Sequence, residues 1–298
     1  MIQVIADSLS LGSVYVLFSL GLSLSWSVLG LLNLAYGAQF MLGAYFAYLF
    51  GGHVHASLLV VLPVAVVAVA ATSVIADYFV FRWLRIRAGT PVESELAMLV
   101  ASIGLAAVAE TIVQNATDGN SEFIPSSTYK VRTLGFGGST LHITNIQLLM
   151  TVVAIVLTIA FAAFVKWTRF GRAMRAAAVD PATCELLGVN ANRLFSVTMA
   201  ISGGMAGLAG VLLGIDLTNV QFQMGDPLVT KAFAVIIIGG VGSIAGAAVG
   251  GYLLAFAETL VVVYGPSTYQ DAISFALIII VLLVRPTGLF AQRRWQRS

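Results

Sequence analysis

The chain has 298 residues, of which 59% are hydrophobic and 9% charged, with a formal net charge of +2 and a mean hydropathy of +0.97. Soluble domains carry about 25% charged residues, so this composition excludes a surface that faces water on all sides. The apolar segments are long and lack polar alternation, which predicts membrane-spanning helices and not a closed barrel.

The apolar runs predict an all-α polytopic membrane protein with about eight or nine transmembrane or re-entrant helices in one domain, 1–298. No Lys or Arg precedes Arg82, so we expect no cleavable signal peptide and a first run that stays in the membrane. One run is too long for a single span, and Gly239–Ser243 near its middle predicts a split into two short arms. The runs lie at about 9–32, 34–50, 56–80, 95–116, 144–165, 195–215, 229–264 and 270–284.

The basic residues predict the orientation of the chain, because cytoplasmic loops are rich in Lys and Arg. They gather after the third run, in a loop at about 166–194, and after the last run, so these regions and the C-terminus are expected in the cytoplasm. The loop at about 117–143 carries few basic residues and is expected outside, and the N-terminus is then outside as well. Gly-rich turns within this outer loop predict a small hairpin at 133–144. The hairpin is a docking surface for an external partner or a plain connection.

The cytoplasmic loop contains the most specific feature of the sequence. Asp180 followed by Pro181 is typical of a helix start, and Gly188 of a helix stop, which together predict a short helix at 181–187. Ala182, Leu186 and Leu187 give this helix an apolar side. Such a helix fits a groove on a cytoplasmic protein, and it also fits the lipid headgroup layer; the spacing alone favours neither.

Glycines recur at helical spacing in two of the runs. Gly203, Gly207 and Gly210 share one helical face, and Gly242, Gly246 and Gly250 are expected to share another. Small residues let helix backbones approach closely in lipid, so helix packing is the main role that we expect for both sets.

Ionisable residues within predicted spans need protein partners or water. Glu110 and Glu258 fall inside runs, and each is either a pathway residue or, as the spacing favours, a helix-end acid wetted from outside. Asp77, Asp216 and Lys231 lie near predicted helix ends, where the side chain can reach the interface.

Enzyme signatures are absent from the sequence. It contains no Gly-x-x-x-x-Gly-Lys-[Ser/Thr] loop for ATP phosphates and no serine in a nucleophile elbow. The histidines lie in outer loops with no acid or cysteine nearby, and Cys184 is the single cysteine. We therefore expect a non-catalytic protein without cofactor, metal or nucleic acid.

Several segments together resemble the LivH-like permease subunits of branched-chain amino acid ABC importers, and the resemblance covers nearly the whole chain. Tyr36 stands where the family usually has His, which puts a role for that ring nitrogen in doubt. The segments that carry the resemblance are Gly30–Tyr45, Arg175–Gly188, Ala206–Val211, Gly239–Gly251, Glu258 and Arg285–Phe290.

The resemblance implies an importer complex in a bacterial inner membrane. Its other parts would be a LivM-like second permease subunit, two cytoplasmic ATPases and a periplasmic or lipid-anchored binding protein that delivers a small-molecule substrate. The resemblance also favours ATPase docking for the short cytoplasmic helix. The residues expected to couple to the ATPase are Arg172, Arg175, Asp180, Pro181, Glu185, Leu187 and Gly188.

In such an importer the permease needs only weak polar contacts along its pathway. The candidates are Asn33, Tyr36, Gln39, Ser243 and Glu258. Branched-chain or other hydrophobic amino acids are the leading substrate class, with urea, short amides and aromatic acids as alternatives. The rival functions are a stand-alone secondary transporter or channel, for which the spans offer few acids, and a membrane scaffold.

Overall fold

A computed structural model of the chain is predominantly helical. Six of its described helices are long and apolar enough to cross a membrane. This agrees with the predicted polytopic membrane protein, although the predicted total of eight or nine segments is not established by it. The structure describes residues 2–30, 32–54, 57–87, 90–124, 129, 133–135, 142–179, 184, 186, 188–285 and 287–290.

The long helices follow the predicted apolar runs, with several ends displaced. They are α1 (Ile2–Leu29), α3 (Leu58–Ala76), α5 (Pro91–Ala116), α6 (Asn145–Trp167), α9 (Ala191–Leu217) and α11 (Ile244–Tyr264). Helix α3 continues without a break through a π-helical turn, η1 (Asp77–Phe81), into α4 (Arg82–Arg87). The shorter helices are α2 (Tyr36–Val54), α7 (Arg169–Ala177), α10 (Asp226–Gly239) and α12 (Gln270–Val284), with a 3-10 turn, η2 (Ser267–Tyr269).

Local sequence explains why several helices begin where they do. Thr90 and Thr144 form capping boxes with Glu93 and Gln147, three residues further on. Each threonine side chain accepts a backbone N–H of the first turn, and the Glu or Gln side chain accepts the N–H of the cap residue.

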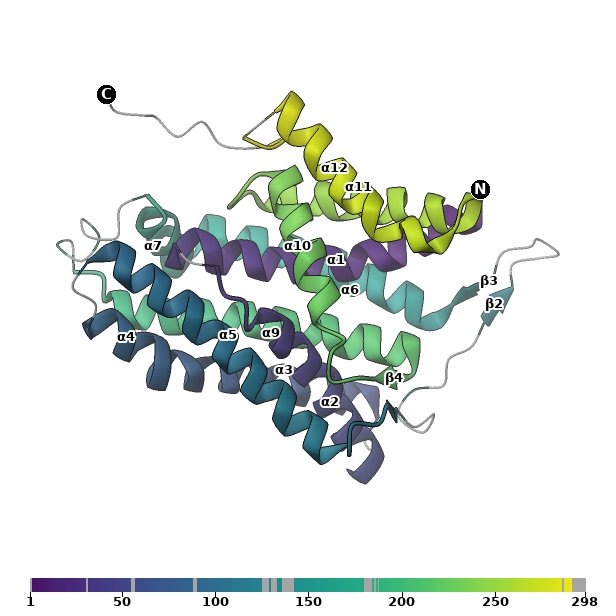
Figure 1. The fold of residues 1–298 in the computed structure, drawn as a ribbon, viewed down its shortest axis with the longest axis horizontal. Helices are drawn as coiled ribbons and strands as arrows, with labels where there is room; N and C mark the ends of the chain where they lie inside the picture. Colours follow the sequence, from purple (N-terminus) through teal and green to yellow (C-terminus); the bar gives the residue numbers. More distant parts are fainter. Residues whose placement is uncertain are drawn as a thin grey trace.

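Short strands mark one end of the molecule, opposite the end that holds α4 and α7 (Figure 1). Strands β2 (Thr133–Gly135) and β3 (His142–Thr144) pair antiparallel, which confirms the predicted hairpin. Strands β1 (Glu122–Phe123) and β4 (Asn219–Val220) also pair and join the ends of α5 and α9. We call these two ends the hairpin end and the α7 end.

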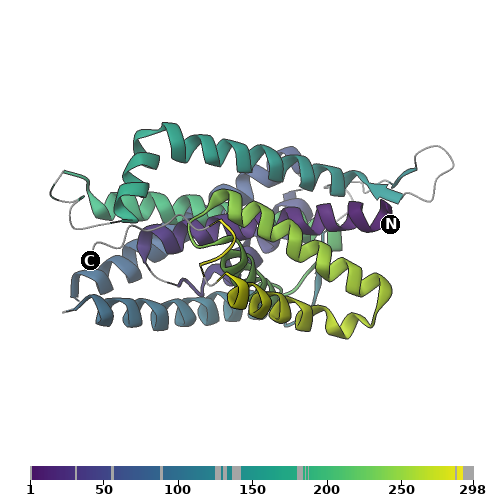
Figure 2. The same cartoon turned by 90° about the horizontal axis from the view of Figure 1, so that it is seen from above.

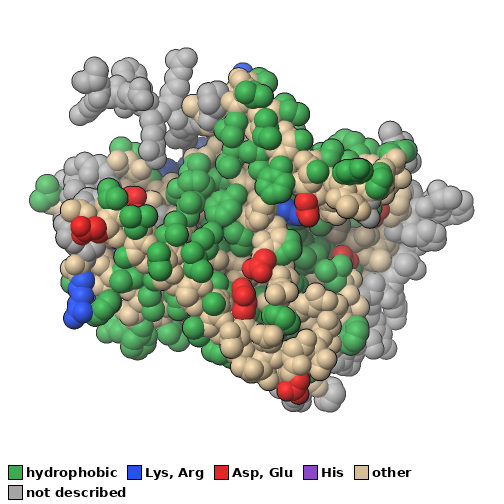
Figure 3. All heavy atoms as spheres, in the orientation of Figure 1, with side chains coloured by type: hydrophobic (Ala, Val, Ile, Leu, Met, Phe, Trp, Pro, Cys, Tyr) green, Lys and Arg blue, Asp and Glu red, His purple; other side chains and the backbone are tan. Residues whose placement is uncertain are grey.

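The core of the bundle is formed by α1 and α9, which pack against each other. Helix α1 also packs on α11, and α9 on α2 and α3. Within their apolar windows 72% of α1 and 83% of α9 is buried, against 17% for α5 and for α6. The outer helices therefore present mostly hydrophobic side chains, as the face in Figure 3 shows.

The predicted division of the 229–264 run is present between α10 and α11. Gly240 and Gly242 have φ angles of +96° and +79°, which favour glycine, and they turn the chain between the two helices. The expectation that Gly242 shares a helical face with Gly246 and Gly250 is wrong. Its positive φ places it in the turn, and α11 begins two residues later at Ile244.

Candidate functional site

Helix α7 is joined firmly to the end of α6, from which it turns back at the α7 end (Figure 2). Arg175 donates to the carbonyl oxygen of Val165 at 2.6 Å, and Arg172 to that of Trp167 at 3.1 Å. These bonds satisfy carbonyls that the last turn of a helix leaves without an intrahelical partner. A Cβ on Gly171 would overlap the backbone of Val165. The two helices therefore form one elbow.

The chain between α7 and α9 is described only in part. Asp180, Pro181, Glu185 and Leu187, four of the predicted coupling residues, lie outside the described residues. Gly188 has a φ of +85°, which suits a chain reversal.

Two described residues of this segment face opposite ways. Cys184 is buried in a cluster with Met174 and Leu194, which connects the segment to α7 and α9. Leu186 is 88% exposed. An apolar side chain that projects this far from the protein is suited to contact a partner or lipid.

Three candidate pathway residues lie together near the start of α2, and all three are buried. Tyr36 is fully buried and donates through its hydroxyl to the carbonyl oxygen of Ser202 on α9 at 2.9 Å. Asn33 accepts the N–H of Ala35 at 3.1 Å and holds the turn before α2. Gln39 is 6% exposed. This group joins α2 to α9 and opens on no described pocket.

Ser243 lies apart from that group, at the start of α11. Its hydroxyl oxygen accepts the backbone N–H of Gly246 at 3.0 Å, so it is the N-cap of this helix. Sequence reasoning selected it as a pathway residue and did not foresee the cap.

Glu258 on α11 is the centre of a buried polar cluster. Its Oε2 accepts hydrogen bonds from Tyr15 at 2.6 Å, Lys231 at 3.0 Å and Gln270 at 2.9 Å, and its Oε1 accepts one from Ser274 at 2.5 Å. The donors come from α1, α10 and α12. Glu258 is fully buried, so the interpretation of a helix-end acid wetted from outside is wrong.

Lys231 is the ion-pair partner of Glu258 and keeps only 12% of its side chain exposed. The expectation that it reaches the interface is therefore wrong. Its placement near a predicted helix end suggested that expectation, whereas the tertiary fold brings a carboxylate 27 residues away along the chain to its ammonium group.

A second buried carboxylate lies near the α7 end. Asp77, on the π-helical turn η1, is fully buried, pairs with Arg85 at 2.9 Å and accepts the Ser196 hydroxyl at 2.6 Å. The Arg85 guanidinium also lies over the ring of Phe195 at 4.6 Å. The expectation that Asp77 lies at the interface is wrong, because its side chain ties η1 to the first turns of α9.

The glycines of α9 lie against neighbouring helices. A Cβ on Gly207 would come within 2.8 Å of Val69 on α3, and a Cβ on Gly43 of α2 would overlap the backbone of Gly207. Gly203 meets Ser73 and Gly210 meets Phe40 in the same way. Gly246 lies against Gly239, and Gly250 against Val235 of α10. Contacts this close allow van der Waals packing between backbones.

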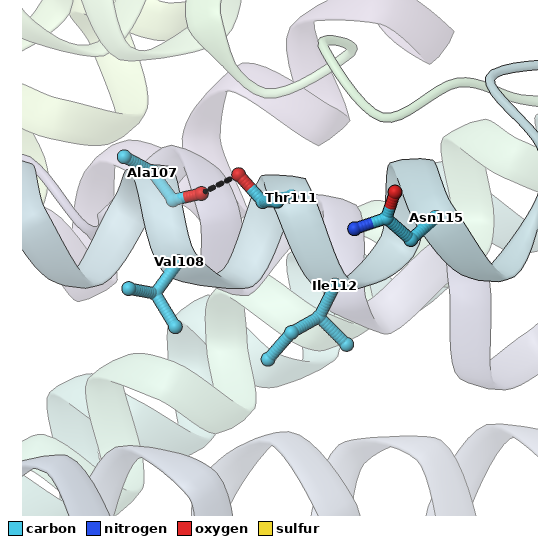
Figure 4. A pocket seen from close by; sticks show the side chains of 5 residues that line it. All are labelled: Ala107, Val108, Thr111, Ile112 and Asn115. Atoms are coloured by element: carbon cyan, nitrogen blue, oxygen red, sulfur yellow. Dashed lines mark hydrogen bonds between the residues drawn. The ribbon is translucent and has the colours of Figure 1, made fainter.

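A shallow pocket lies on the outer face of α5 and includes none of the candidate residues. Its lining residues all come from one helix (Figure 4). The Thr111 hydroxyl in this pocket already donates to the carbonyl oxygen of Ala107 at 2.7 Å. Among the described residues no group of three or more His, Cys, Asp or Glu could hold a metal ion.

Comparison with known proteins gives consistent matches along the whole chain. The family described as branched-chain amino acid transport system / permease component matches residues 4–282. The high-affinity branched-chain amino acid permease protein LivH of Escherichia coli is 32% identical over 298 residues, which cover 98% of this chain and 96% of LivH.

Two further relatives match over similar lengths. The high-affinity branched-chain amino acid permease protein BraD of Pseudomonas aeruginosa is 31% identical over 300 residues, 98% of this chain and 96% of BraD. A probable branched-chain amino acid permease protein of Methanocaldococcus jannaschii is 27% identical over 298 residues, 96% of this chain and 91% of the relative.

Proposed function

Because the chain belongs to the family of branched-chain amino acid transport permease components, it is a transport permease subunit, and we propose that it imports branched-chain or other hydrophobic amino acids. The observation that carries this proposal is the match over nearly the whole of both chains. It is a multi-pass inner-membrane protein, in agreement with its six long apolar helices. Urea, short amides and aromatic acids are the alternative substrates.

The importer would draw its energy from separate ATPase subunits that bind the segment at 180–188. The α6–α7 elbow and helix α9 flank this segment in the sequence. When the ATPases close on ATP, the segment would move as a lever, and the bonds of Arg172 and Arg175 to α6 would carry the movement into the membrane. The pathway would then open alternately to the two sides.

The orientation that we propose places the α7 end in the cytoplasm, together with the C-terminus. Helices α4 and α7 lie at the same end of the molecule (Figure 1), and both are rich in arginine. Basic residues are retained on the cytoplasmic side. The hairpin and the N-terminus then lie outside, where a periplasmic or lipid-anchored binding protein would deliver its ligand.

A second permease subunit, LivM-like or another copy of this chain, would complete the pathway. The outer face of α5 carries polar groups that lipid would not satisfy, among them Glu110 and Asn115. Asp226, exposed at the start of α10, lies near enough to Glu110 to interact with it electrostatically. We propose that this face borders the pathway, while Asn33, Tyr36 and Gln39 hold the neighbouring helices α2 and α9.

The coupling proposal is tested at Leu186. In the reconstituted complex, Leu186→Asp should abolish the stimulation of ATPase activity by ligand-loaded binding protein, because a charged group would enter an apolar contact. Leu186→Met keeps the contact apolar and should retain stimulation. Membrane insertion of both variants, checked by yield from the membrane fraction, should match that of the unsubstituted chain. Normal stimulation in Leu186→Asp would contradict the lever.

A stand-alone transporter or channel is the rival function. Its discriminating feature would be transport by the purified chain in liposomes without any ATPase. The buried carboxylates Asp77 and Glu258 are both neutralised by basic partners, which does not favour an ion-coupling role for either.

A further inference from the structure

One of the hydrogen-bond donors of Lys231 is unused among the described residues. An ammonium group carries three N–H donors. Two of them reach the hydroxyl of Tyr15 and Oε2 of Glu258, each at 3.0 Å. The only other anionic group that the described structure places beside it is Asp271, whose Oδ1 lies 3.7 Å away, beyond hydrogen-bond distance. One N–H of Lys231 therefore has no acceptor within hydrogen-bond distance among the described residues.

The position of the Lys231 ammonium group is fixed by its buried partner, Glu258. Glu258 is itself held by Tyr15, Gln270 and Ser274 from two neighbouring helices. A lysine side chain is normally flexible, with a high rotamer entropy. Here the cost of ordering it is met on folding and not on binding, which is the condition for a preorganised contact.

Asp271 stands in front of the same group, in the first turn of α12, with 74% of its side chain exposed. One ammonium thus faces two carboxylates, and the cluster carries an excess of one negative charge. Figure 3 shows a basic and an acidic side chain side by side on the exposed face over α10 and α12. The exposed Asp271 carboxylate can therefore pair with a cationic group of a ligand.

We propose that Lys231 and Asp271 form a weak binding site for the zwitterionic head of an α-amino acid at the mouth of the pathway. The substrate carboxylate accepts the spare N–H of Lys231, and its ammonium group pairs with Asp271. One carbon atom separates the two charges of an α-amino acid, so they can meet two adjacent protein charges of opposite sign. This inference rests on the proposed function and names the part of the substrate that the permease itself recognises.

The location supports a transport role over a purely structural ion pair. Ionisable residues on membrane helices face protein or water and mark substrate pathways. Glu258 and Lys231 face protein inside the bundle. Asp271 points outward, so it must face water because a carboxylate cannot lie among the lipid acyl chains. Under the orientation proposed above, α10 and α12 both begin on the outer side, where the binding protein releases its ligand.

The test is uptake of radiolabelled leucine by the complete complex in proteoliposomes, with its ATPases, partner permease and leucine-loaded binding protein. Asp271→Asn keeps the shape of the side chain and removes its charge. It should lower the initial rate at a subsaturating concentration of loaded binding protein by about two- to fivefold, as the loss of one exposed charge contact implies. Asp271→Glu keeps the negative charge and should restore most of the rate. If Asp271 acted only through the shape of its side chain, Asp271→Asn would be the better tolerated of the two variants.

Asp118→Asn is the matched control, because Asp118 is an exposed acid in the loop after α5. It should leave the rate unchanged. Wild-type uptake by Asp271→Asn would overturn the zwitterion site and leave the proposed function intact. No ATP-dependent leucine uptake by the unsubstituted complex would overturn the proposed substrate class, and this site with it.

Discussion

Glu258 takes its donors from three neighbouring helices, and Lys231 is its only cationic partner at hydrogen-bond distance in the described part of the chain. A buried charge loses its hydration, so this carboxylate is tolerated because Lys231 and three neutral donors replace the water. At the scale of single residues, we expect the stability of the protein to depend more on Glu258 than on any other described side chain.

Removing one partner of the pair should cost far more than removing both. Glu258→Leu leaves the largely buried Lys231 ammonium with only the exposed Asp271 carboxylate, 3.7 Å away, as counter-charge, and should destabilise the protein by about 3 kcal/mol. The double variant Glu258→Leu/Lys231→Met replaces the pair by apolar groups and should recover most of that loss. Thermal unfolding of the three proteins in detergent measures the difference. A double variant no more stable than Glu258→Leu would show that the two charges are not coupled.

Sequence alone located Glu258 but not its surroundings. An acid inside an apolar run is conspicuous, yet whether it is wet or buried depends on which helices pack around it. Lys231 and Tyr15 are separated from Glu258 by 27 and 243 positions, and no spacing rule links residues so distant. The interface position predicted for Asp77 is wrong for the same reason, because its partners Arg85 and Ser196 meet it through a π-helical turn and a different helix.

At the scale of elements, α2 and α9 can approach closely because Gly43 on α2 lies against Gly207 on α9. Gly43→Ala would force a methyl group into the backbone of Gly207. It should destabilise the protein by about 1–3 kcal/mol, as overpacking of a core does. Gly104→Ala on α5 is the matched control, since no atom lies within 4 Å of its added Cβ, and it should stabilise by about 1 kcal/mol through helix propensity. Thermal unfolding compares them; equal behaviour would refute the proposed contact.

The α6–α7 elbow makes a separate prediction about coupling. Arg175→Gln removes the charged donor to the carbonyl of Val165 and should weaken the elbow by about 1 kcal/mol. The stimulation of ATPase activity by loaded binding protein should then fall by about fivefold, while folding persists. Arg169→Gln serves as control, because the described structure gives Arg169 no hydrogen bond or ion pair. Unchanged stimulation in Arg175→Gln would remove Arg175 from the coupling route.

Helix positions were predictable from apolar runs and caps, and α12 matches its predicted run, 270–284, at both ends. The division at the glycine-rich turn was predictable as well, because glycine with positive φ terminates helices. The π-helical turn at Asp77–Phe81 was not, since its residues also fit an ordinary α-helix. Ser243 was selected as a pathway residue although a serine before a helix is typical of an N-cap.

At the scale of the whole molecule, the most buried helices are not the most apolar ones. Helices α1 and α9 are the least apolar of the six spans and the most buried, while α3 and α6 are the most apolar and mostly exposed. Lipid is as apolar as a leucine-rich core, so burial in a membrane is driven by close packing of small residues and by hydrogen bonds. Sequence reasoning identified the spans but had no basis for ranking them from inside to outside.

Under the proposed function, the chain is a conduit that moves solute only when separate ATPases drive it. The direct measurement is leucine uptake into proteoliposomes by the purified chain alone and by the complex with its partner permease, ATPases and binding protein. We expect no uptake by the chain alone and ATP-dependent accumulation by the complex. Leucine transport by the isolated chain, at a rate unaffected by ATP and ATPases, would contradict the account.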